Sequence, residues 1–350
     1  MEPRARPFRG LPHHQQMCKV SIIVPNYNHA RYLPKRIGTI LRQTYQDFEL
    51  ILLDDCSTDD SRLVLSRYAN DPRVRIEFND VNSGSTFKQW NKGVQMANGE
   101  YVWIAESDDY ADEKLLETLV RALDRDEHIV FAYCRSWQVD ADSVVGGSGD
   151  RHLDILNGQL WAADFVMDGR EHCRKYSLRS PVIGNASGAV FRRSAYENVG
   201  GADESLRLCG DWKLWAALAL TGRVAYVNAR LNYFRYHSST VRSTTACDGR
   251  DVFEKLLVLR WILEQVGSDD VDVRHACEEA ANHWVPAVMS FKMPIGAKRA
   301  IWRLVKAFDR HPMLRLGRPG TAAVRRKLAA QWRALRFALR VQDARRRVAS

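Results

Sequence analysis

Two adjacent carboxylates, Asp108 and Asp109, stand directly after the apolar run Tyr101–Ala105. The two charges repel each other unless a positive charge lies nearby. Hard oxygen ligands favour Mg²⁺ or Mn²⁺, and Mg²⁺ is usually held by one or two carboxylates together with substrate phosphates. A metal–diphosphate would supply that charge, with one carboxylate on the cation and the other on a ligand hydroxyl. The alternative is a solvated turn that caps the helix expected from Asp112.

Two further polar clusters follow apolar runs. The run "FELILLDD" ends in Asp54 and Asp55, where a carboxylate can accept a hydrogen bond from a ligand N–H. The run "VSIIVPNYN" is ended by Pro25 and is followed by Tyr27. The Tyr27 ring offers a face on which a nucleobase can stack, a contact worth about 1–3 kcal/mol. The alternatives are a helix cap at the first cluster and a packed loop aromatic at the second.

Strands and helices must alternate to place these clusters. Apolar runs predict strands at 20–28, 48–55, 74–78, 101–106 and 129–134, and helical periodicity predicts helices at 31–44, 57–70, 85–99 and 112–126. This alternation is typical of an α/β fold with a mostly parallel sheet flanked by helices. In such folds, ligands bind at the carboxyl ends of the strands, where all three clusters fall.

After residue 135 the pattern changes. Residues 140–158 are rich in Gly and Asp and predict a loop, and 185–201 predict a strand followed by a short helix. A helix is expected at 209–222, an extended segment at 223–240, and mainly helices from residue 251 onward.

Charge and cysteine content narrow the class of protein. The 350 residues carry a net charge of +10, but sixteen basic and two acidic residues lie from Lys298 onward, so the rest of the chain is slightly acidic. The seven cysteines form no CxxC pair, which indicates reduced cytosolic thiols. Residues 1–17 read as a flexible leader without the apolar segment of a secretory signal, and no run approaches the roughly 18 apolar residues of a spanning helix. We expect a cytoplasmic protein, or one bound to the inner face of the cell membrane.

The segments "VSIIVPNYNHARYLPKRIGTILRQTYQDFELILLDDCSTDDS" and "NKGVQMANGEYVWIAESDD" together resemble the family 2 glycosyltransferases, which have the GT-A fold. The resemblance implies an inverting sugar transfer from a nucleoside-diphosphate sugar, a UDP-sugar as first choice, with Mg²⁺ or Mn²⁺ as cofactor. The resemblance covers roughly residues 19–245, so we expect a GT-A domain at 18–245 between the flexible leader at 1–17 and a basic helical extension at 246–350. Within the GT-A domain, 18–135 would be the nucleotide-binding half and 136–245 the acceptor-side half.

The resemblance also implies roles for single residues at the strand ends. Tyr27 and Asp55 would contact the nucleobase, with Pro25 beside them. Asp108 would lie near the ribose, and Asp109 would ligate the metal. The family's motif is often Asp-x-Asp, and we match it to Ser107–Asp109.

Further residues match family elements in the second half. Asp211 in "LRLCGDWKLW" matches the catalytic base at a helix start, and an in-line displacement needs one such carboxylate opposite the leaving diphosphate. The segment "YFRYHSSTVRS" resembles an Arg-x-His element, so Arg235, His237 and the nearby Arg242 are expected to contact the diphosphate. Lys88 is a further expected donor contact. The alternatives are a helix cap for Asp211 and a structural strand histidine for His237.

The C-terminal residues 321–348 combine an apolar stripe with many arginines. The stripe consists of Val324, Leu328, Trp332, Leu335 and Leu339. Two interpretations stay open: a helix on an anionic membrane surface, or a helix packed on the catalytic domain. No nucleic-acid motif accompanies the arginines, so no nucleic-acid partner is expected. The expected acceptor is a glycan or lipid-linked sugar in polysaccharide synthesis.

Three other functions compete with glycosyl transfer. A sugar nucleotidyltransferase would carry a Gly-rich loop after the first strand, and "PNYNHARY" contains no glycine. A dinucleotide-dependent oxidoreductase lacks its GxGxxG motif for the same reason. A non-catalytic scaffold with a basic docking tail is disfavoured by the intact carboxylates.

Overall fold

The computed structural model describes residues 18–236, 249–267, 270–289 and 293–309. Its strands are β1 Val20–Asn26, β2 Phe48–Asp54, β3 Val74–Phe78, β4 Tyr101–Ile104, β5 Tyr110–Ala111, β6 Ile129–Val139, β7 Val145–Ser148, β8 Phe165–Asp168, β9 Ala189–Arg192 and β10 Arg223–Arg235.

In the first half of the chain, helices alternate with strands, and the last three described helices follow one another without a strand between them. The helices are α1 Leu33–Leu41, α2 Ser61–Ser66, α3 Thr86–Met96, α4 Leu115–Leu123, α5 Arg151–Asn157, α6 Gly169–His172, α7 Arg193–Asn198, α8 Gly210–Ala219, α10 Arg250–Val266, α11 Asp270–Met289 and α12 Ile295–Phe308. Short helical turns are η1 Leu160–Ala162, η2 Cys173–Ser177 and η3 Ala186–Gly188.

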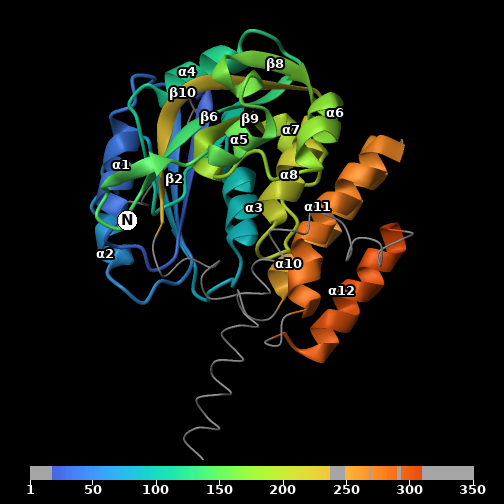
Figure 1. Cartoon of the computed structure of the whole chain (residues 1–350). Helices are drawn as coiled ribbons and strands as arrows, with labels where there is room; N and C mark the ends of the chain where they lie inside the picture. Colours follow the sequence, from blue (N-terminus) through green and yellow to red (C-terminus); the bar gives the residue numbers. More distant parts are fainter. Residues whose placement is uncertain (1–17, 237–248, 268–269, 290–292, 310–350) are drawn as a thin grey trace, which may run out of the picture.

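One sheet runs through the described residues in the order β3-β2-β1-β4-β9-β6-β10-β5, with β7 beside β6 and β8 beside β10 (Figure 1). The first four strands of this order are parallel, and so are β6 and β10. Strand β9 is antiparallel to both of its neighbours. The predicted α/β fold with a mostly parallel sheet flanked by helices is confirmed, although the sequence did not indicate the reversed direction of β9.

Alternate residues of each strand face opposite layers. In β1, Ile22 and Val24 pack with α1, α2 and α4 on one side, whereas Ile23 packs toward α3 on the other. All three side chains are fully buried. Burial on both faces explains why this strand reads as a continuous apolar run, and it holds the strand ends in a fixed register.

The predicted loop at 140–158 is wrong. Strand β7 pairs with β6 in a hairpin, and α5 follows it and buries Leu153. The hairpin turn is closed by Asp140, whose Oδ1 accepts hydrogen bonds from the backbone N–H groups of Asp142 and Val144. Tertiary pairing with β6 therefore decides the structure of a segment whose Gly- and Asp-rich composition favours a loop.

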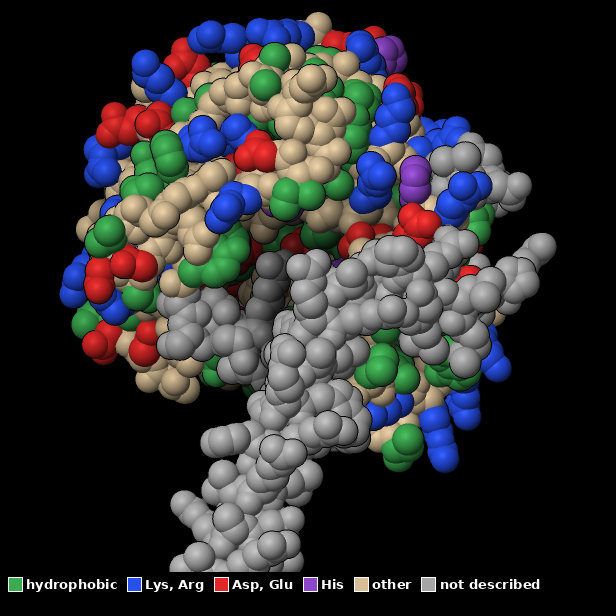
Figure 2. Space-filling view, viewed as in Figure 1, with side chains coloured by type: hydrophobic (Ala, Val, Ile, Leu, Met, Phe, Trp, Pro, Cys, Tyr) green, Lys and Arg blue, Asp and Glu red, His purple; other side chains and the backbone are tan. Residues whose placement is uncertain are grey.

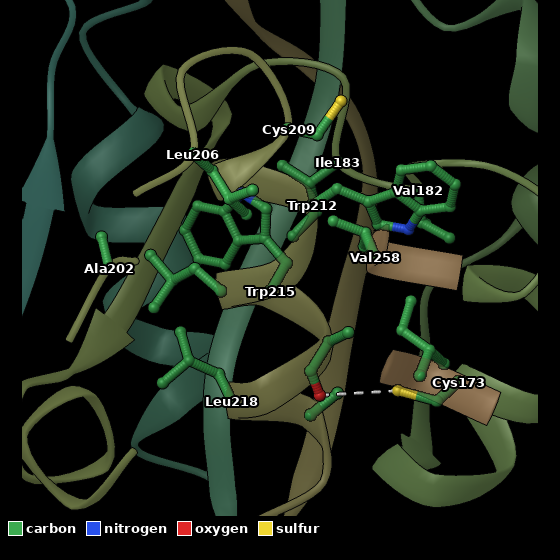
Figure 3. Packing of buried hydrophobic residues seen from close by; sticks show 14 of the residues in the cluster. Cys173, Val182, Ile183, Ala202, Leu206, Cys209, Trp212, Trp215, Leu218 and Val258 are labelled. Carbon is green, nitrogen blue, oxygen red and sulfur yellow. Dashed lines mark hydrogen bonds between the residues drawn. The ribbon is translucent and has the colours of Figure 1, made fainter. Parts of the chain in front are cut away.

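Helices α10, α11 and α12 pack together beside α8 (Figure 1). Leu256 and Leu259 of α10 belong to the same buried cluster as Trp212 and Trp215 of α8 (Figure 3). The described part of the predicted helical extension thus shares its core with the sheet. No described helix is both long and apolar enough to cross a membrane, and the six described cysteines carry free thiols.

Candidate active site

The carboxyl ends of β2, β1 and β4 lie side by side. Parallel register pairs Asn26 with Asp54 and Ile23 with Ile104. A cavity of about 310 Å³, here called the strand-end cavity, opens at this edge. The predicted site residues in its wall are Pro25, Tyr27, Asp55 and Asp108, and the wall also includes Asn26, His29, Gln89, Glu106 and Arg207. The structure therefore brings the three sequence clusters together, and Figure 2 shows acidic side chains in the hollowed middle of one face.

Asp55 is buried and anchors the loop that precedes α3. Its Oδ1 accepts hydrogen bonds from Asn79 Nδ2 (2.7 Å), the Ser83 backbone N–H (2.8 Å) and Gln89 Nε2 (3.0 Å). Its Oδ2 accepts one from Ser83 Oγ (2.8 Å). Because a carboxylate oxygen has two lone pairs, Oδ2 retains the capacity to accept a ligand N–H. The neighbouring Tyr27 ring is 46% exposed and accessible for stacking.

Asp109 follows the wall residue Asp108 but is not itself in the wall of the strand-end cavity, and it is 1% exposed. Its Oδ2 accepts hydrogen bonds from Asn185 Nδ2 and Ser187 Oγ, both at 2.8 Å, and its Oδ1 accepts the backbone N–H of Arg235 at 2.9 Å. Burial, followed by the nearby charge of Asp108, raises the pKa of Asp109. This geometry differs from the predicted metal contact of Asp109, because its oxygens face protein donors. Asp108 is the member of the pair that reaches the cavity wall.

A buried guanidinium lies near these carboxylates. Arg36 of α1 is fully buried and stacks over Trp103, with 5.0 Å between the guanidinium carbon and the ring centroid. Its three nitrogens find no hydrogen-bond partner among the described residues. Burial lowers the pKa of Arg36 to about 10, and the carboxylates of Asp109, Glu106 and Asp108 act in the opposite direction. Arg36 thus supplies a positive charge to the acidic cluster, which the sequence pattern did not reveal.

Arg235 holds the acidic turn from the other side. Its Nε donates to the carbonyl of Asp108 (2.6 Å), and its Nη1 donates to the carbonyls of Asp140 (2.6 Å) and Ala141 (3.1 Å). Its Nη2 donates to Ser143 Oγ (2.9 Å), and the side chain is buried. The guanidinium of Arg235 is therefore directed at protein groups and fixes the turn that carries Asp108, and its contact with a diphosphate stays a prediction.

Glu106 and His29 were not singled out from the sequence. Glu106 accepts a hydrogen bond from Trp90 Nε1 (2.8 Å), and burial, then Asp108 and Asp109, raises its pKa to about 8. His29 Nδ1 lies 2.8 Å from Ser107 Oγ. The sequence did contain a signal for Glu106. Residues 106–108 have the acid-x-acid pattern of the family motif, and they begin one residue before the triplet Ser107–Asp109 that we matched to that motif.

One buried carboxylate of α10 holds the segment that leads into α8. Glu254 accepts hydrogen bonds from the backbone N–H groups of Arg207 (3.0 and 3.1 Å), Leu208 (2.7 Å) and Cys209 (3.1 Å). Glu254 is 4% exposed. The side chain of Arg207 lies in the wall of the strand-end cavity, so its position depends on a helix about 45 residues later in the chain.

Asp211 lies in the first turn of α8, where its Oδ1 accepts the backbone N–H of Trp212 at 2.7 Å. It is half-buried and lines a second cavity of about 330 Å³, here called the helix cavity. Leu208 and Cys209 line the same cavity. Consecutive residues of segment 207–211 therefore border both cavities, with Arg207 on one side and Leu208 on the other.

Of the predicted donor contacts, Lys88 is in neither cavity wall. Lys88 is exposed on α3, whereas Gln89 on the next position lines the strand-end cavity. His237 and Arg242 lie outside the described residues.

The strand-end cavity offers oxygen ligands of the type that Mg²⁺ and Mn²⁺ prefer. Among the described residues, no group of three or more His, Cys, Asp or Glu side chains is arranged to hold a metal. A cation that takes one or two carboxylates and completes its coordination with phosphate oxygens and water needs no such group. Asp108, with Glu106 beside it in the wall, fits this second mode.

A family model and similar proteins point to the same family for this chain. Residues 21–200 match the family model of glycosyl transferase family 2. The chain is 34% identical over 179 residues to the glycosyltransferase GlyG of Streptococcus pneumoniae, covering 51% of this chain and 53% of GlyG. It is 32% identical over 110 residues to the poly(ribitol-phosphate) beta-N-acetylglucosaminyltransferase TarS of Staphylococcus aureus, covering 31% of this chain and 19% of TarS. The chain thus spans about half the length of GlyG and a smaller share of TarS.

Solved structures share the fold. The S. aureus TarS 1–349 complex with UDP-GlcNAc superposes with a TM-score of 0.61 at 19% identity, covering 83% of this chain and 80% of that one. The mannosyltransferase PcManGT of Pyrobaculum calidifontis, in complex with GDP-Man and Mn²⁺, gives a TM-score of 0.55 at 17% identity, covering 93% and 84%. At these identities the likeness concerns the fold.

Proposed function

We propose that this chain, which belongs to glycosyl transferase family 2, transfers a sugar from a nucleoside-diphosphate sugar to an acceptor hydroxyl with inversion at the anomeric carbon. The observation that carries the proposal is the arrangement of the two cavities. Tyr27, Asp55 and Asp108 share the strand-end cavity, and Asp211 lies in the helix cavity across segment 207–211. The chain is a glycosyltransferase by family, and the donor, the cation and the acceptor below are our proposals.

The strand-end cavity is suited to the nucleotide. Tyr27 presents an exposed ring for stacking on the base, with Pro25 beside it. Asp55 Oδ2 can accept an N–H from the base edge, as the imide N–H of uracil would offer. The UDP-GlcNAc in TarS and the GDP-Man in PcManGT support a nucleotide sugar as the ligand class. A UDP-sugar is our first choice of donor.

We assign the metal contact to Asp108 in place of Asp109, because Asp108 reaches the cavity and Asp109 is occupied by three protein donors. When bound, Mg²⁺ or Mn²⁺ supplies positive charge to the diphosphate oxygens. The Mn²⁺ in PcManGT supports a divalent cation. Arg207 is the cationic side chain of the described cavity wall, and we assign to it a diphosphate contact.

Asp211 acts as the general base. Its carboxylate takes the proton of the acceptor hydroxyl while the acceptor oxygen bonds to the anomeric carbon. The bond from that carbon to the diphosphate oxygen breaks on the opposite side, and the nucleoside diphosphate leaves with the bonding electron pair. One displacement of this kind inverts the configuration and requires no covalent intermediate. Arg235 keeps the acidic turn in place by its hydrogen bond to the carbonyl of Asp108, and the charge of Arg36 acts on the same carboxylates without a hydrogen bond.

The test is product analysis with the full chain. UDP-, GDP- and dTDP-sugars are incubated with Mn²⁺, and release of nucleoside diphosphate is measured beside release of pyrophosphate from nucleoside triphosphates with sugar phosphates. We expect nucleoside diphosphate from at least one sugar nucleotide and no pyrophosphate. Pyrophosphate release would instead indicate a nucleotidyltransferase, and neither product would indicate a scaffold.

We further propose that the basic C-terminal residues bring the enzyme to the anionic inner face of the cell membrane, where a lipid-linked or polysaccharide acceptor is made. The support is the sequence charge from Lys298 onward, because each basic residue near an anionic surface contributes about 1 kcal/mol. The apolar stripe and most of these basic residues lie outside the described residues. We expect the full chain to co-sediment with phosphatidylglycerol vesicles at low salt, and a chain ending before Thr321 not to. Absence of binding by both would contradict membrane association.

A further inference from the structure

The helix cavity lies where the start of α8 meets α10 and α11. Its wall combines Cys209 and Asp211 from the segment that leads into and opens α8 with Asp251 and Lys255 of α10 and Glu279 and His283 of α11. The family model matches residues 21–200, so none of these six residues falls within it. The part of the chain that follows the matched region therefore supplies most of this cavity.

Each of the two later helices contributes a polar pair with a spacing of four residues, which places both members on one helix face. Lys255 Nζ lies 3.6 Å from Asp251 Oδ2, and His283 Nε2 lies 3.1 Å from Glu279 Oε1. All four side chains are between 26% and 37% exposed, so they are accessible from the cavity. Together with Asp211, the wall carries three carboxylates against one ammonium and one imidazole.

The remaining wall is apolar apart from Ser180. Pro181, Leu208 and Trp212 line it, and Trp212 is fixed because its Nε1 donates to the carbonyl of Ser177 at 3.1 Å. Figure 3 shows Trp212 among Val182, Ile183 and Val258 in the shared core. A cavity with an apolar floor and converging carboxylates fits a small ligand that has C–H faces and several hydroxyl donors. Its excess of carboxylates disfavours an anionic ligand.

We propose that α10 and α11 form the recognition wall for the acceptor, and that this wall selects an uncharged, hydroxyl-rich sugar or polyol unit. The inference rests on the proposed function, since it takes Asp211 as the base. Glu279 and Asp251 accept hydrogen bonds from acceptor hydroxyls, and Asp211 accepts the hydroxyl that reacts. Glu254, on the same helix as Asp251, holds the backbone of segment 207–209 and so fixes the distance between this wall and the strand-end cavity.

The experiment compares two pairs of probes that differ in one charge: p-nitrophenyl β-D-glucoside with the corresponding glucuronide, and p-nitrophenyl β-D-galactoside with the galacturonide. Binding to the full chain is measured by saturation-transfer NMR in the presence of UDP and Mn²⁺. Transfer to each probe is measured by chromatography with Mn²⁺ and a sugar nucleotide from which the wild type releases nucleoside diphosphate. We expect the neutral member of at least one pair to bind roughly tenfold more tightly than the acid, because a hydrogen bond to a charged group is worth about that factor or more.

Glu279→Gln and Asp251→Asn are the informative variants, and Glu264→Gln is the matched control because Glu264 lies on α10, outside the cavity wall, and pairs with Arg260 at 2.7 Å. We expect Glu279→Gln and Asp251→Asn each to raise the acceptor KM several-fold and to narrow the preference for the neutral probe, with donor KM changed less than twofold. Glu264→Gln should match the wild type in every measurement. Circular dichroism melting checks that each variant is folded.

Three outcomes overturn this inference. They are equal binding of the neutral and acidic probes, unchanged acceptor KM in both cavity variants, and no binding of either neutral probe. Failure of the proposed function looks different: the wild type would release no nucleoside diphosphate from any sugar nucleotide. Neutral probes that still bind in a Glu279-dependent way would then show a carbohydrate site without transfer.

Discussion

Asp55 in the wall of the strand-end cavity and the buried Asp109 next to Asp108 are each held by several groups from neighbouring elements. In the helix cavity, by contrast, Asp211 depends on a segment that one carboxylate of α10 holds. Asp55 accepts four hydrogen bonds and Asp109 three. Segment 207–209 donates three successive backbone N–H groups to Glu254 alone. The donor side is thus preorganised by the sheet, and the acceptor side is set by the packing of later helices.

This difference has a consequence for variation between relatives. Strand register fixes the proposed nucleotide site, so we expect changes there to disturb both nucleotide binding and stability. The acceptor wall is built from a part of the chain that lies beyond the family match, and it can change without moving the sheet. Variants on the two sides should therefore separate donor binding from acceptor use.

The largest expected effect concerns the base. Asp211→Asn should lower the rate of transfer by roughly 10²–10⁴-fold, the usual worth of a positioned base, because the amide cannot take the acceptor proton. Donor affinity, measured by calorimetry with UDP and Mn²⁺, should stay within about threefold of wild type. If this variant keeps wild-type turnover, Asp211 is only a helix cap, and the helix cavity does not supply the base for transfer.

The next effect separates the two adjacent carboxylates. Asp108→Asn should weaken Mn²⁺-dependent binding of UDP by roughly 10–100-fold or more, with little change in melting temperature, because it removes a cation ligand from an accessible wall. Asp109→Asn should instead lower the free energy of unfolding by about 1–3 kcal/mol. The NH₂ group of Asn would face a buried hydrogen-bond donor that now binds a carboxylate oxygen of Asp109, and that donor would lose its partner. Calorimetry and denaturant unfolding of both variants decide the assignment, and the reverse pattern would restore Asp109 as the metal contact.

A smaller effect is expected where α10 holds segment 207–209. Glu254→Ala should lower the rate constant for transfer by roughly 10–100-fold, since a shift of about 1 Å at a remote support can cost this much. Donor KM should rise by a smaller factor, because Glu254 also holds the backbone of Arg207, the proposed diphosphate contact, whereas Tyr27 and Asp55 do not depend on Glu254. Glu254→Gln, which keeps one acceptor oxygen, should recover part of the rate. Equal losses in transfer rate and donor affinity would mean that Glu254 supports the whole fold and does not act on the acceptor side.

The smallest effect on activity is expected from a core residue outside both cavities. His172 is buried, packs against Tyr133 and Tyr176, and has no hydrogen-bond partner among the described residues for either ring nitrogen. Burial lowers its pKa to about 4. The unfolded chain therefore binds a proton below pH 6.5 that the folded chain binds only near pH 4, so stability should fall by about 3 kcal/mol as the pH drops through this window.

His172→Phe removes this titration. Its unfolding free energy should depend less on pH between 6.5 and 4 than that of the wild type, while transfer at neutral pH should be preserved. Urea unfolding at several pH values measures the difference. If the unfolding free energies of the wild type and the variant depend on pH in the same way, His172 is not the source of the pH dependence of stability.

The sequence was sufficient to predict that the strand-end clusters lie together, because each cluster directly follows its own strand. Each strand ends in its own polar cluster, and parallel pairing alone brings Tyr27, Asp55 and Asp108 to one edge. The roles within the acidic pair could not be read from the sequence, because adjacent side chains point in opposite directions and only the pairing with η3 and β10 shows which one is buried. Asp109 is the buried one, held by Ser187 and the backbone of Arg235.

The sequence also contained no sign of the charged residues that act on the candidate site from other elements of the fold. Arg36 reads as a polar position on an amphipathic helix, yet it is buried beneath the acidic turn. Arg207 and Glu254 read as ordinary surface charges, and only the packing of α10 against segment 207–209 gives them a place at the site. The acceptor wall depends on contacts between parts of the chain that lie tens of residues apart, and such contacts leave no periodic signal in the sequence.

The stereochemistry of transfer tests the central claim most directly. If the donor lies in the strand-end cavity and Asp211 activates the acceptor from the helix cavity, attack must come from the face opposite the diphosphate. Proton NMR of the first product formed by the full chain from an α-linked sugar nucleotide should then show a β-configured anomeric proton. Product with the α configuration retained would contradict single in-line displacement, and with it the roles assigned to the two cavities.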